Sequence, residues 1–332
     1  MISRVLSPVA RWLSPVVAAA AVASGVTVAA VPDGAVSAEV WLATEANPLV
    51  GRPFYVDPNS KAARAAKADP SPELEVIAGT PTAYWMDHVS NFAYDAKVIK
   101  AAQEAGAMPI LALYAIPNRD CGSFAAGGFG SATAYRDWID RVAGAIGDGP
   151  ATVILEPDAL AMADCLSAAQ REERYDLIAY AVDRLTANPA TVVYVDAGHS
   201  RCVPAEEMAN RLNRVGVHKA RGFSVNTANF FTTEEEIGYG EAISGLTGGA
   251  HYVVDTSRNG AGPADGELYW CNPPGRALGT PPTTATAGAH ADAYLWIKRP
   301  GESDGSCGRG EPAAGTFVNQ YAIDLVRNAG RA

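Results

Sequence analysis

The chain has 332 residues, of which 48% are hydrophobic and 19% are charged, and its formal net charge is -10. This composition fits one large soluble domain or two small ones, with a sizeable core. The acidic balance argues against nucleic acids and anionic membranes as partners.

The N-terminal segment has the features of a secretory signal. Two arginines precede an apolar run at residues 13–30, and V-S-A at residues 36–38 provides the small residues of a cleavage site. We therefore predict a signal peptide at residues 1–38 and a protein that is secreted or held at the cell envelope, without stable membrane association after cleavage. The alternative is a membrane anchor, because the apolar run is nearly long enough to span a bilayer.

The remaining chain, residues 39–332, shows no linker and no internal repeat, so we expect one catalytic domain and a monomer. Strand-like and helix-like segments alternate from about residue 81. The predicted strands are 81–86, 108–116, 151–157, 191–195, 222–228, 251–255 and 293–298. The predicted helices are 89–105, 132–146, 166–186, 205–219, 233–246 and 316–328, and residues 257–290 are expected to be irregular. Such alternation predicts a parallel sheet, and about seven repeats favour an α/β barrel over an open sheet.

One predicted strand runs directly into a carboxylate. Residues 153–160 read V-I-L-E-P-D-A-L, so Asp158 stands at the C-terminal end of a buried strand. In an alternating β/α protein, this is where catalytic residues are placed. Taken alone, Asp158 could equally be a cap of the helix that follows.

Three more aspartates follow other predicted strands: Asp120, Asp196 and Asp304. The C-terminal ends of parallel strands meet at one mouth, so these side chains should converge on Asp158. Carboxylates that converge repel one another, which raises the pKa of at least one of them. A protonated acid and an ionised base are what the hydrolysis of a glycosidic bond requires.

Aromatic and polar residues at the same edges suit a sugar. The aromatic rings are those of Trp85, Tyr114, Trp270 and Trp296, and they could stack on pyranose rings or belong to the core, the core being favoured for Trp296. The polar groups are His199, Asn226, Asn229, Lys298 and Glu302, and a structural role for His199 is equally compatible with the pattern. We expect Glu234 to Glu236 to be merely solvated.

The chain contains five cysteines, Cys121, Cys165, Cys202, Cys271 and Cys307, all in the part predicted to be exported, where disulfides persist. An odd number leaves one without a partner. None belongs to a C-x-x-C pair, which argues against a thiolate zinc site.

Five segments together resemble glycoside hydrolase family 6, the inverting cellulases. They are Y-A-I-P-N-R-D-C-G-S-F-A-A-G-G, V-I-L-E-P-D-A-L-A, Y-V-D-A-G-H-S, G-F-S-V-N-T-A-N-F and W-I-K-R-P-G-E-S-D-G. The resemblance implies a distorted, incomplete parallel (β/α) barrel of about seven strands. It also implies cleavage of β-1,4-glucan with inversion and with no metal or other cofactor.

The resemblance assigns a role to each aspartate. Asp158 is implied as the general acid, and Asp120 as the residue that raises its pKa and helps to position the attacking water. Asp304 is the proposed base, and Asp196 supports sugar binding and the charge balance of the site. Tyr114 is expected under the distorted sugar.

Further implied sugar contacts are Trp85, Trp270, Lys298 and Glu302. From their place at the rim, we also expect His199 and Asn229 to bind the substrate. The resemblance also implies two disulfides, Cys121 with Cys165 and Cys271 with Cys307, which leaves Cys202 unpaired. Two positions depart from the family pattern. Cys202 stands where a tryptophan usually stacks on the sugar just past the cleavage point, and Phe230 stands where a tyrosine is common.

Three functions from different classes remain open. The favoured one is an endo-acting cellulase, because a chain of 294 residues after signal removal (332 − 38) leaves little room for tunnel-forming loops; cellobiohydrolase-type exo action is its variant. A second is a secreted glucan-binding protein of weak activity, which Cys202 makes conceivable. The third is a metal-dependent hydrolase, against which the presence of only 5 histidines weighs.

Overall fold

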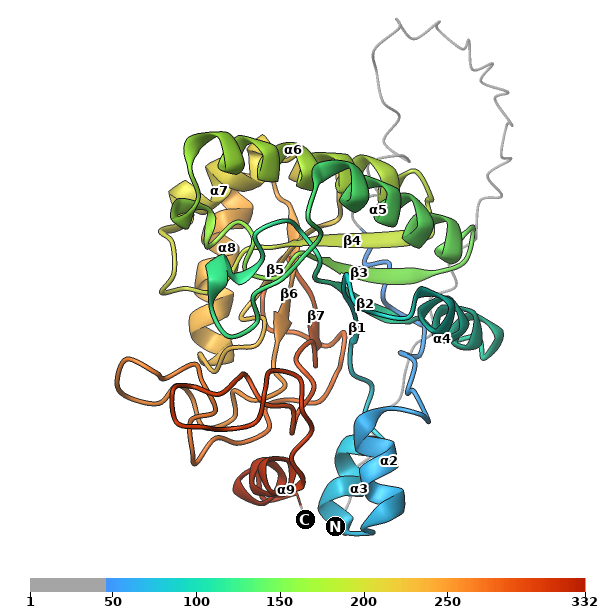
Figure 1. The fold of residues 1–332 in the computed structure, drawn as a ribbon, viewed down its shortest axis with the longest axis vertical. Coiled ribbons are helices and arrows are strands. Elements are labelled where there is room, and N and C mark those ends of the chain that lie inside the picture. Colours follow the sequence, from blue (N-terminus) through green and yellow to red (C-terminus); the bar gives the residue numbers. More distant parts are fainter. Residues whose placement is uncertain (1–45, 332) are drawn as a thin grey trace, which may run out of the picture. The chain divides into compact units, whose positions relative to one another are not determined.

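The computed structural model describes residues 46–331 of the chain, and Figure 1 shows their ribbon. The predicted signal segment lies outside the described residues. None of the helices within residues 46–331 combines the length and the apolar character needed to cross a membrane.

Seven parallel strands form one sheet in the order of the sequence. They are β1 (Tyr84–Met86), β2 (Ile110–Leu113), β3 (Ala151–Leu155), β4 (Thr191–Asp196), β5 (Gly222–Val225), β6 (His251–Asp255) and β7 (Ala291–Leu295). The sheet curls, and its two edges are β1 and β7 (Figure 1). Beyond these edges, Ala83 N donates to Trp296 O at 2.9 Å. The predicted incomplete parallel barrel is thus confirmed.

The strands are buried on both faces, which explains their continuous apolar runs. Along β3, Val153 and Leu155 belong to the core between the sheet and its helices, whereas Ile154 belongs to the core inside the curl of the sheet. Tyr194 and Leu295 join Ile154 in this inner core. Side chains of successive residues point to opposite faces, so each strand supplies both cores.

Five helices connect the strands and a sixth follows β7. They are α4 (Phe92–Glu104), α5 (Ala132–Ile146), α6 (Ala168–Thr186), α7 (Ala205–Arg214), α8 (Thr233–Leu246) and α9 (Asn319–Asn328). Of these, α4, α5, α6 and α8 begin at side-chain caps. The Asn91 side chain accepts from the first turn of α4, so this helix starts three residues later than predicted. The helix predicted over 205–219 ends at Arg214, because Gly216 adopts a left-handed conformation before the short 3₁₀ segment Val217–Lys219.

Two helices that the sequence analysis did not identify precede β1. They are α2 (Lys61–Ala68) and α3 (Pro72–Ala78), capped by Ser60 and Ser71. Leu74 and Ile77 of α3 pack with Trp296 and with α9. The core assignment of Trp296 is confirmed, because this side chain is fully buried in that cluster.

Candidate active site

Asp158 and Asp196 lie together where β3 and β4 end. The backbone N of Asp158 donates to Asp196 Oδ1 at 2.9 Å, and Gly198 N donates to the same oxygen at 3.0 Å. Ser224 Oγ, from β5, donates to Asp196 Oδ2 at 2.9 Å. Asp158 has a positive φ of 66°, a conformation that non-glycine residues seldom adopt. Asp196 therefore fixes the turn that presents Asp158.

Asp158 holds its proton more strongly than an ordinary carboxyl group. Burial, and then the negative charges of Asp196 and Asp120, raise its pKa to about 8. Burial also raises the pKa of Asp196, to about 6, although hydrogen bonds to its carboxylate oppose this shift. Of these two coupled groups, Asp158 is the one that stays protonated at neutral pH.

Asp120 and Tyr114 occupy the segment after β2. Ala125 N donates to Asp120 Oδ2 at 2.6 Å, and burial raises the pKa of Asp120. The Arg119 guanidinium lies 4.4 Å from the centre of the Tyr114 ring. Burial, and then the charges of Asp158 and Asp120, raise the pKa of the Tyr114 phenol. Trp85 meets the Tyr114 ring edge-on at 5.4 Å.

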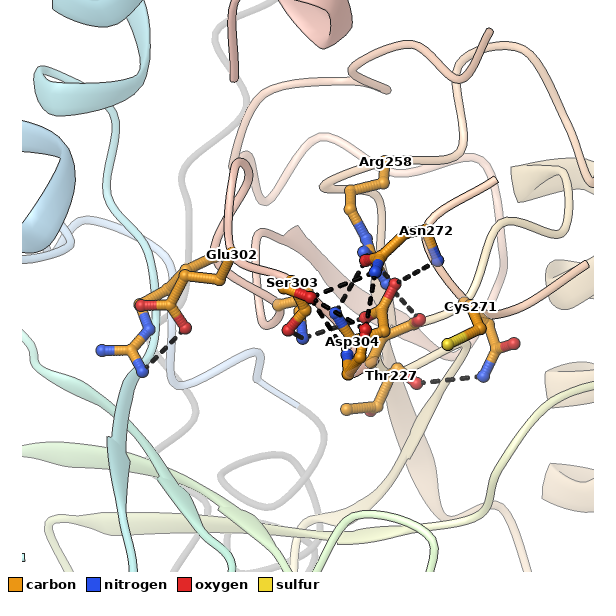
Figure 2. Close-up of polar contacts among 12 residues, drawn as sticks. Thr227, Arg258, Cys271, Asn272, Glu302, Ser303 and Asp304 are labelled. Atoms are coloured by element: carbon orange, nitrogen blue, oxygen red, sulfur yellow. Dashed lines mark hydrogen bonds and ion pairs between the residues drawn. The ribbon is translucent and has the colours of Figure 1, made fainter. Parts of the chain in front are cut away.

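Asp304 has the opposite electrostatic environment. Its carboxylate pairs with Arg258 Nη1 at 2.8 Å and with Lys298 Nζ at 3.0 Å. Asn272 N donates to Asp304 Oδ2 at 3.1 Å, and Asp304 N donates to Asn272 Oδ1 at 2.7 Å (Figure 2). Burial alone would raise the pKa of Asp304, but the charges of Arg258 and Lys298 outweigh it and lower the pKa. This carboxylate is ionised at neutral pH.

Arg258 is a site residue that the sequence analysis missed. It is buried, lies two residues beyond the Thr256 that follows β6, and donates to Ala228 O as well as to Asp304. Its guanidinium lies 4.3 Å from the centre of the Phe230 ring, so Phe230, one of the two departures from the family pattern, is covered by a cation. The available signal was a basic residue shortly after a buried strand, within a stretch that we expected to be irregular.

Two further carboxyl groups hold the strand ends together. Glu156 accepts hydrogen bonds from the backbone of Ala115 and Ile116, and burial raises its pKa to about 7. Asp255 accepts from backbone N–H groups that include those of Ala228 and Lys298. Both side chains are fully buried, so their role is to position the loops that carry the other groups.

The other predicted sugar-binding residues differ in their environment. Glu302 is buried and pairs with Lys61 at 3.2 Å and Arg299 at 3.0 Å, away from Asp304 (Figure 2). His199 is only 6% exposed and stacks on the Phe231 ring at 4.4 Å, and burial lowers its pKa to about 4.

Asn226, Asn229 and Trp270 complete the predicted set. Asn226 is fully buried and donates to Phe231 O and Asp255 O. Asn229 Nδ2 donates to Thr227 O at 3.2 Å, while its Oδ1 is buried without a partner. Trp270 is half-buried, with its ring 5.9 Å from that of Phe124. Trp270 thus keeps a partly accessible ring, whereas Asn226 is tied into the scaffold.

Both implied disulfides are present, Cys121–Cys165 and Cys271–Cys307, and they join loops on either side of the aspartates. Cys202 is free, as expected. Its residue reaches the surface, but its sulfur is crowded, since a Cβ added to Gly198 would meet it at 3.0 Å. Burial of the sulfur atom, together with nearby carboxylates that include Asp158, raises the pKa of the Cys202 thiol to about 12.

The expectation that Glu234 to Glu236 are solvated is wrong for Glu236. This side chain is fully buried, because the first turn of α8 packs against the segment after β4. Ser200 N donates to Glu236 Oε1 at 3.0 Å, and burial raises the pKa of Glu236 to about 7. Of the three consecutive glutamates, Glu236 thus lies on the inner face of α8.

A cavity of about 580 Å³ lies between α9 and the segments around Asn272 and Arg309. None of the four aspartates lines it, although Arg258 and Asn272 reach it from behind Asp304. Within residues 46–331, no group of three or more His, Cys, Asp or Glu residues is arranged to hold a metal ion.

Comparison with known proteins gives one family. The sequence profile of glycosyl hydrolases family 6 matches residues 49–329. Endoglucanase A of Cellulomonas fimi is 45% identical over 284 residues, which cover 83% of this chain and 61% of that protein. Endoglucanase 1 of Streptomyces halstedii is 43% identical, with 82% and 88% covered. This chain thus spans about three fifths of the length of the Cellulomonas protein.

A solved structure is more similar still. It is the endoglucanase Cel6 from Mycobacterium tuberculosis in complex with methyl-cellobiosyl-4-deoxy-4-thio-β-D-cellobioside. Its TM-score is 0.84 and its sequence identity is 67%, over 86% of this chain and 100% of that one. A more distant curated relative is the probable 1,4-β-D-glucan cellobiohydrolase C of Aspergillus terreus, 29% identical over 86% of this chain and 76% of that protein.

The environment of Asp158 predicts a pH-dependent gain in stability for Asp158→Asn. A carboxyl group whose pKa is raised on folding stabilises the fold below its unfolded pKa, and this contribution is lost as the pH rises toward 8. The free energy of unfolding of the variant, relative to that of wild type, should therefore rise by on the order of 1–3 kcal/mol between pH 4 and pH 8. Urea unfolding at both pH values measures this, with the exposed Asp183→Asn as control; a difference that does not change with pH would contradict the assignment.

Proposed function

The chain belongs to glycosyl hydrolases family 6, and on this premise we propose that it is a cellulase that hydrolyses β-1,4-glucan with inversion. The observation that carries the proposal is that the pKa of one carboxyl group is raised and that of another is lowered. Burial and the charges of Asp196 and Asp120 keep Asp158 protonated, whereas Asp304 is paired with two cations and stays ionised. An acid and a carboxylate in these states are the equipment of an inverting glycosidase.

Asp158 acts as the general acid. Its proton passes to the glycosidic oxygen while the bond from that oxygen to the anomeric carbon breaks. As the proton leaves, the repulsion from Asp196 and Asp120 that raised the pKa of Asp158 is felt in full, so these groups favour the protonated state before the reaction. Exchange with solvent then restores the proton.

The attacking water approaches the anomeric carbon from the opposite face of the sugar ring, which inverts the configuration. Asp120 positions this water, and the proton that the water releases passes to Asp304. The two cations beside Asp304 make it a weak base, so it accepts the proton late, after positive charge has built up on the sugar. Asp196 keeps the turn of Asp158 in place.

The sugar is held by rings and by charged side chains. We assign the ring of Tyr114 to the sugar at the cleavage point, and Trp85 and Trp270 to its neighbours. Lys298 acts mainly by holding Asp304, and its remaining hydrogen-bonding capacity is available to a hydroxyl group. Since Glu302 is already paired twice, its contribution is to support the loop rather than to supply a free carboxylate.

We further propose that the enzyme acts within chains, on soluble or amorphous glucan, and that it is secreted as a monomer. Endo action is supported by the names of the relatives that are 42–45% identical, all endoglucanases. The cellobiohydrolase relatives are about 28–29% identical. Secretion is supported by the signal-like residues 1–38.

Replacing the acid should abolish hydrolysis. Asp158→Asn cannot donate a proton to the leaving oxygen, so we expect kcat on cellopentaose to fall by about 10²- to 10⁴-fold while the oligosaccharide still binds. Product release measured by chromatography, with binding by calorimetry, tests this, and Asp183→Asn is the matched surface control. Hydrolysis at the wild-type rate would show that Asp158 is not the acid.

Endo action predicts a rapid loss of viscosity in carboxymethylcellulose. Each internal cut shortens the average chain greatly, so the viscosity should fall steeply while few reducing ends are released. Viscometry in parallel with a reducing-sugar assay measures the ratio of the two. A small viscosity loss for each reducing end would indicate exo action instead.

A further inference from the structure

We propose that Tyr269 binds the sugar on the leaving side of the cleaved bond and takes the place of the ring that is missing at Cys202. The inference rests on the proposed function. Tyr269 was not among the residues that the sequence analysis selected, and it lies in the long irregular segment between β6 and β7. Its case rests on how its ring is held and on where it lies relative to Asp158.

The Tyr269 ring is fixed by two other rings. It meets Phe231 at 5.5 Å with an interplanar angle of 64°, and His199 at 6.3 Å with an angle of 87°. His199 and Phe231 are themselves stacked and buried. Tyr269 is only half-buried, so two inner rings orient it while part of its surface stays accessible. An aromatic ring held rigidly in this way is suited to stack on a pyranose.

Tyr269 lies beside the segment that carries Cys202. Its ring meets that of His199, and the backbone oxygen of His199 accepts from Cys202 N at 3.0 Å. Arg201 lies over the Phe231 ring, 4.8 Å from its centre. The side chains after β4 and the tip of the irregular segment thus form one cluster, in which cysteine fills much less volume than tryptophan would.

The same cluster reaches the general acid. The Cys202 sulfur lies against Gly198, where an added Cβ would meet it at 3.0 Å. Gly198 N and Asp158 N both donate to Asp196 Oδ1, so this side of the cluster adjoins the turn of the general acid. The general acid must touch the leaving oxygen, so the sugar beyond that oxygen lies on the side of Asp158. The order Asp158, Cys202, Tyr269 therefore follows the path of the leaving sugar.

Trp270, the next residue, also holds this segment in place. Its ring contacts a different loop from that of Tyr269: it lies 5.9 Å from the ring of Phe124, in the loop that carries Asp120. Cys271 follows and is bonded to Cys307. Tyr269 thus contacts the rings of His199 and Phe231, Trp270 contacts that of Phe124, and the disulfide at Cys271 anchors the segment.

The Tyr269 hydroxyl is also available to a ligand. Among residues 46–331 it has no hydrogen-bond partner, in contrast to Tyr84, Tyr194 and Tyr239, whose hydroxyls donate to Asp95, Asp292 and Val203 O. A sugar hydroxyl could take that place. The ring supplies the stacking surface, and the hydroxyl supplies a polar contact at its rim.

Two substrates that differ only on the leaving side test the proposal. Cellopentaose places sugar beyond the cleaved bond, whereas β-cellobiosyl fluoride releases fluoride and places none there. Tyr269→Ala should lower kcat/KM for cellopentaose about fivefold, as expected for a ring contact of about 1 kcal/mol. It should change kcat/KM for the fluoride less than about twofold. Tyr269→Phe, which keeps the ring, should retain most of the activity on cellopentaose.

The exposed Tyr94 of α4 provides the matched control, since Tyr94→Ala should alter neither substrate. An equal loss on both substrates for Tyr269→Ala would overturn the proposal in favour of a structural role through His199 and Phe231. No loss on cellopentaose would also overturn it. If the wild-type protein hydrolyses neither substrate, it is the proposed function that fails.

Discussion

The site depends on an uneven distribution of positive charge among carboxyl groups that one sheet edge brings together. Burial and the charges of Asp196 and Asp120 raise the pKa of Asp158 by more than Lys298 lowers it, whereas Asp304 forms ion pairs with both Arg258 and Lys298. A buried carboxyl group among other carboxyl groups keeps its proton, while a buried one that is paired with two cations loses it. The same amino acid therefore fills two opposite roles, and the difference is set entirely by neighbours that come from other strands.

Such an arrangement costs stability, and the scaffold compensates near the strand ends. Asp196 accepts three hydrogen bonds there, two of them from the turn that carries Asp158 and the segment after β4. Glu156 and Asp255 accept backbone N–H groups of neighbouring segments. The disulfides Cys121–Cys165 and Cys271–Cys307 hold the loops beside Asp120 and Asp304, and they reduce the entropy that ordering these loops costs.

Much of this could be predicted from the sequence because it is local. Apolar runs that end at Asp158 or Asp196 mark both a buried strand and the place where its C-terminal end opens to the site. The two disulfides came from the resemblance to a family and could not have been derived from spacing alone. The core position of Trp296, in turn, followed from its place within a strand pattern.

What could not be predicted depends on contacts between distant segments. The sequence around Arg258 does not indicate that this residue pairs with Asp304, which is 46 residues further on. Glu236 looks solvated within an acidic run, and only the packing of α8 against Ser200 buries it. The position of the Tyr269 ring likewise depends on Phe231, one helix and one strand earlier in the chain, and on His199, two helices and two strands earlier.

The central claim is that a protonated Asp158 and an ionised Asp304 act on opposite faces of the sugar. Proton NMR of the first products from a cellooligosaccharide tests this most directly, because it shows the anomeric configuration before mutarotation. The account predicts that the new reducing end appears first as the α-anomer, formed from a β-bond by a single displacement. Initial release of the β-anomer would mean retention and would contradict it.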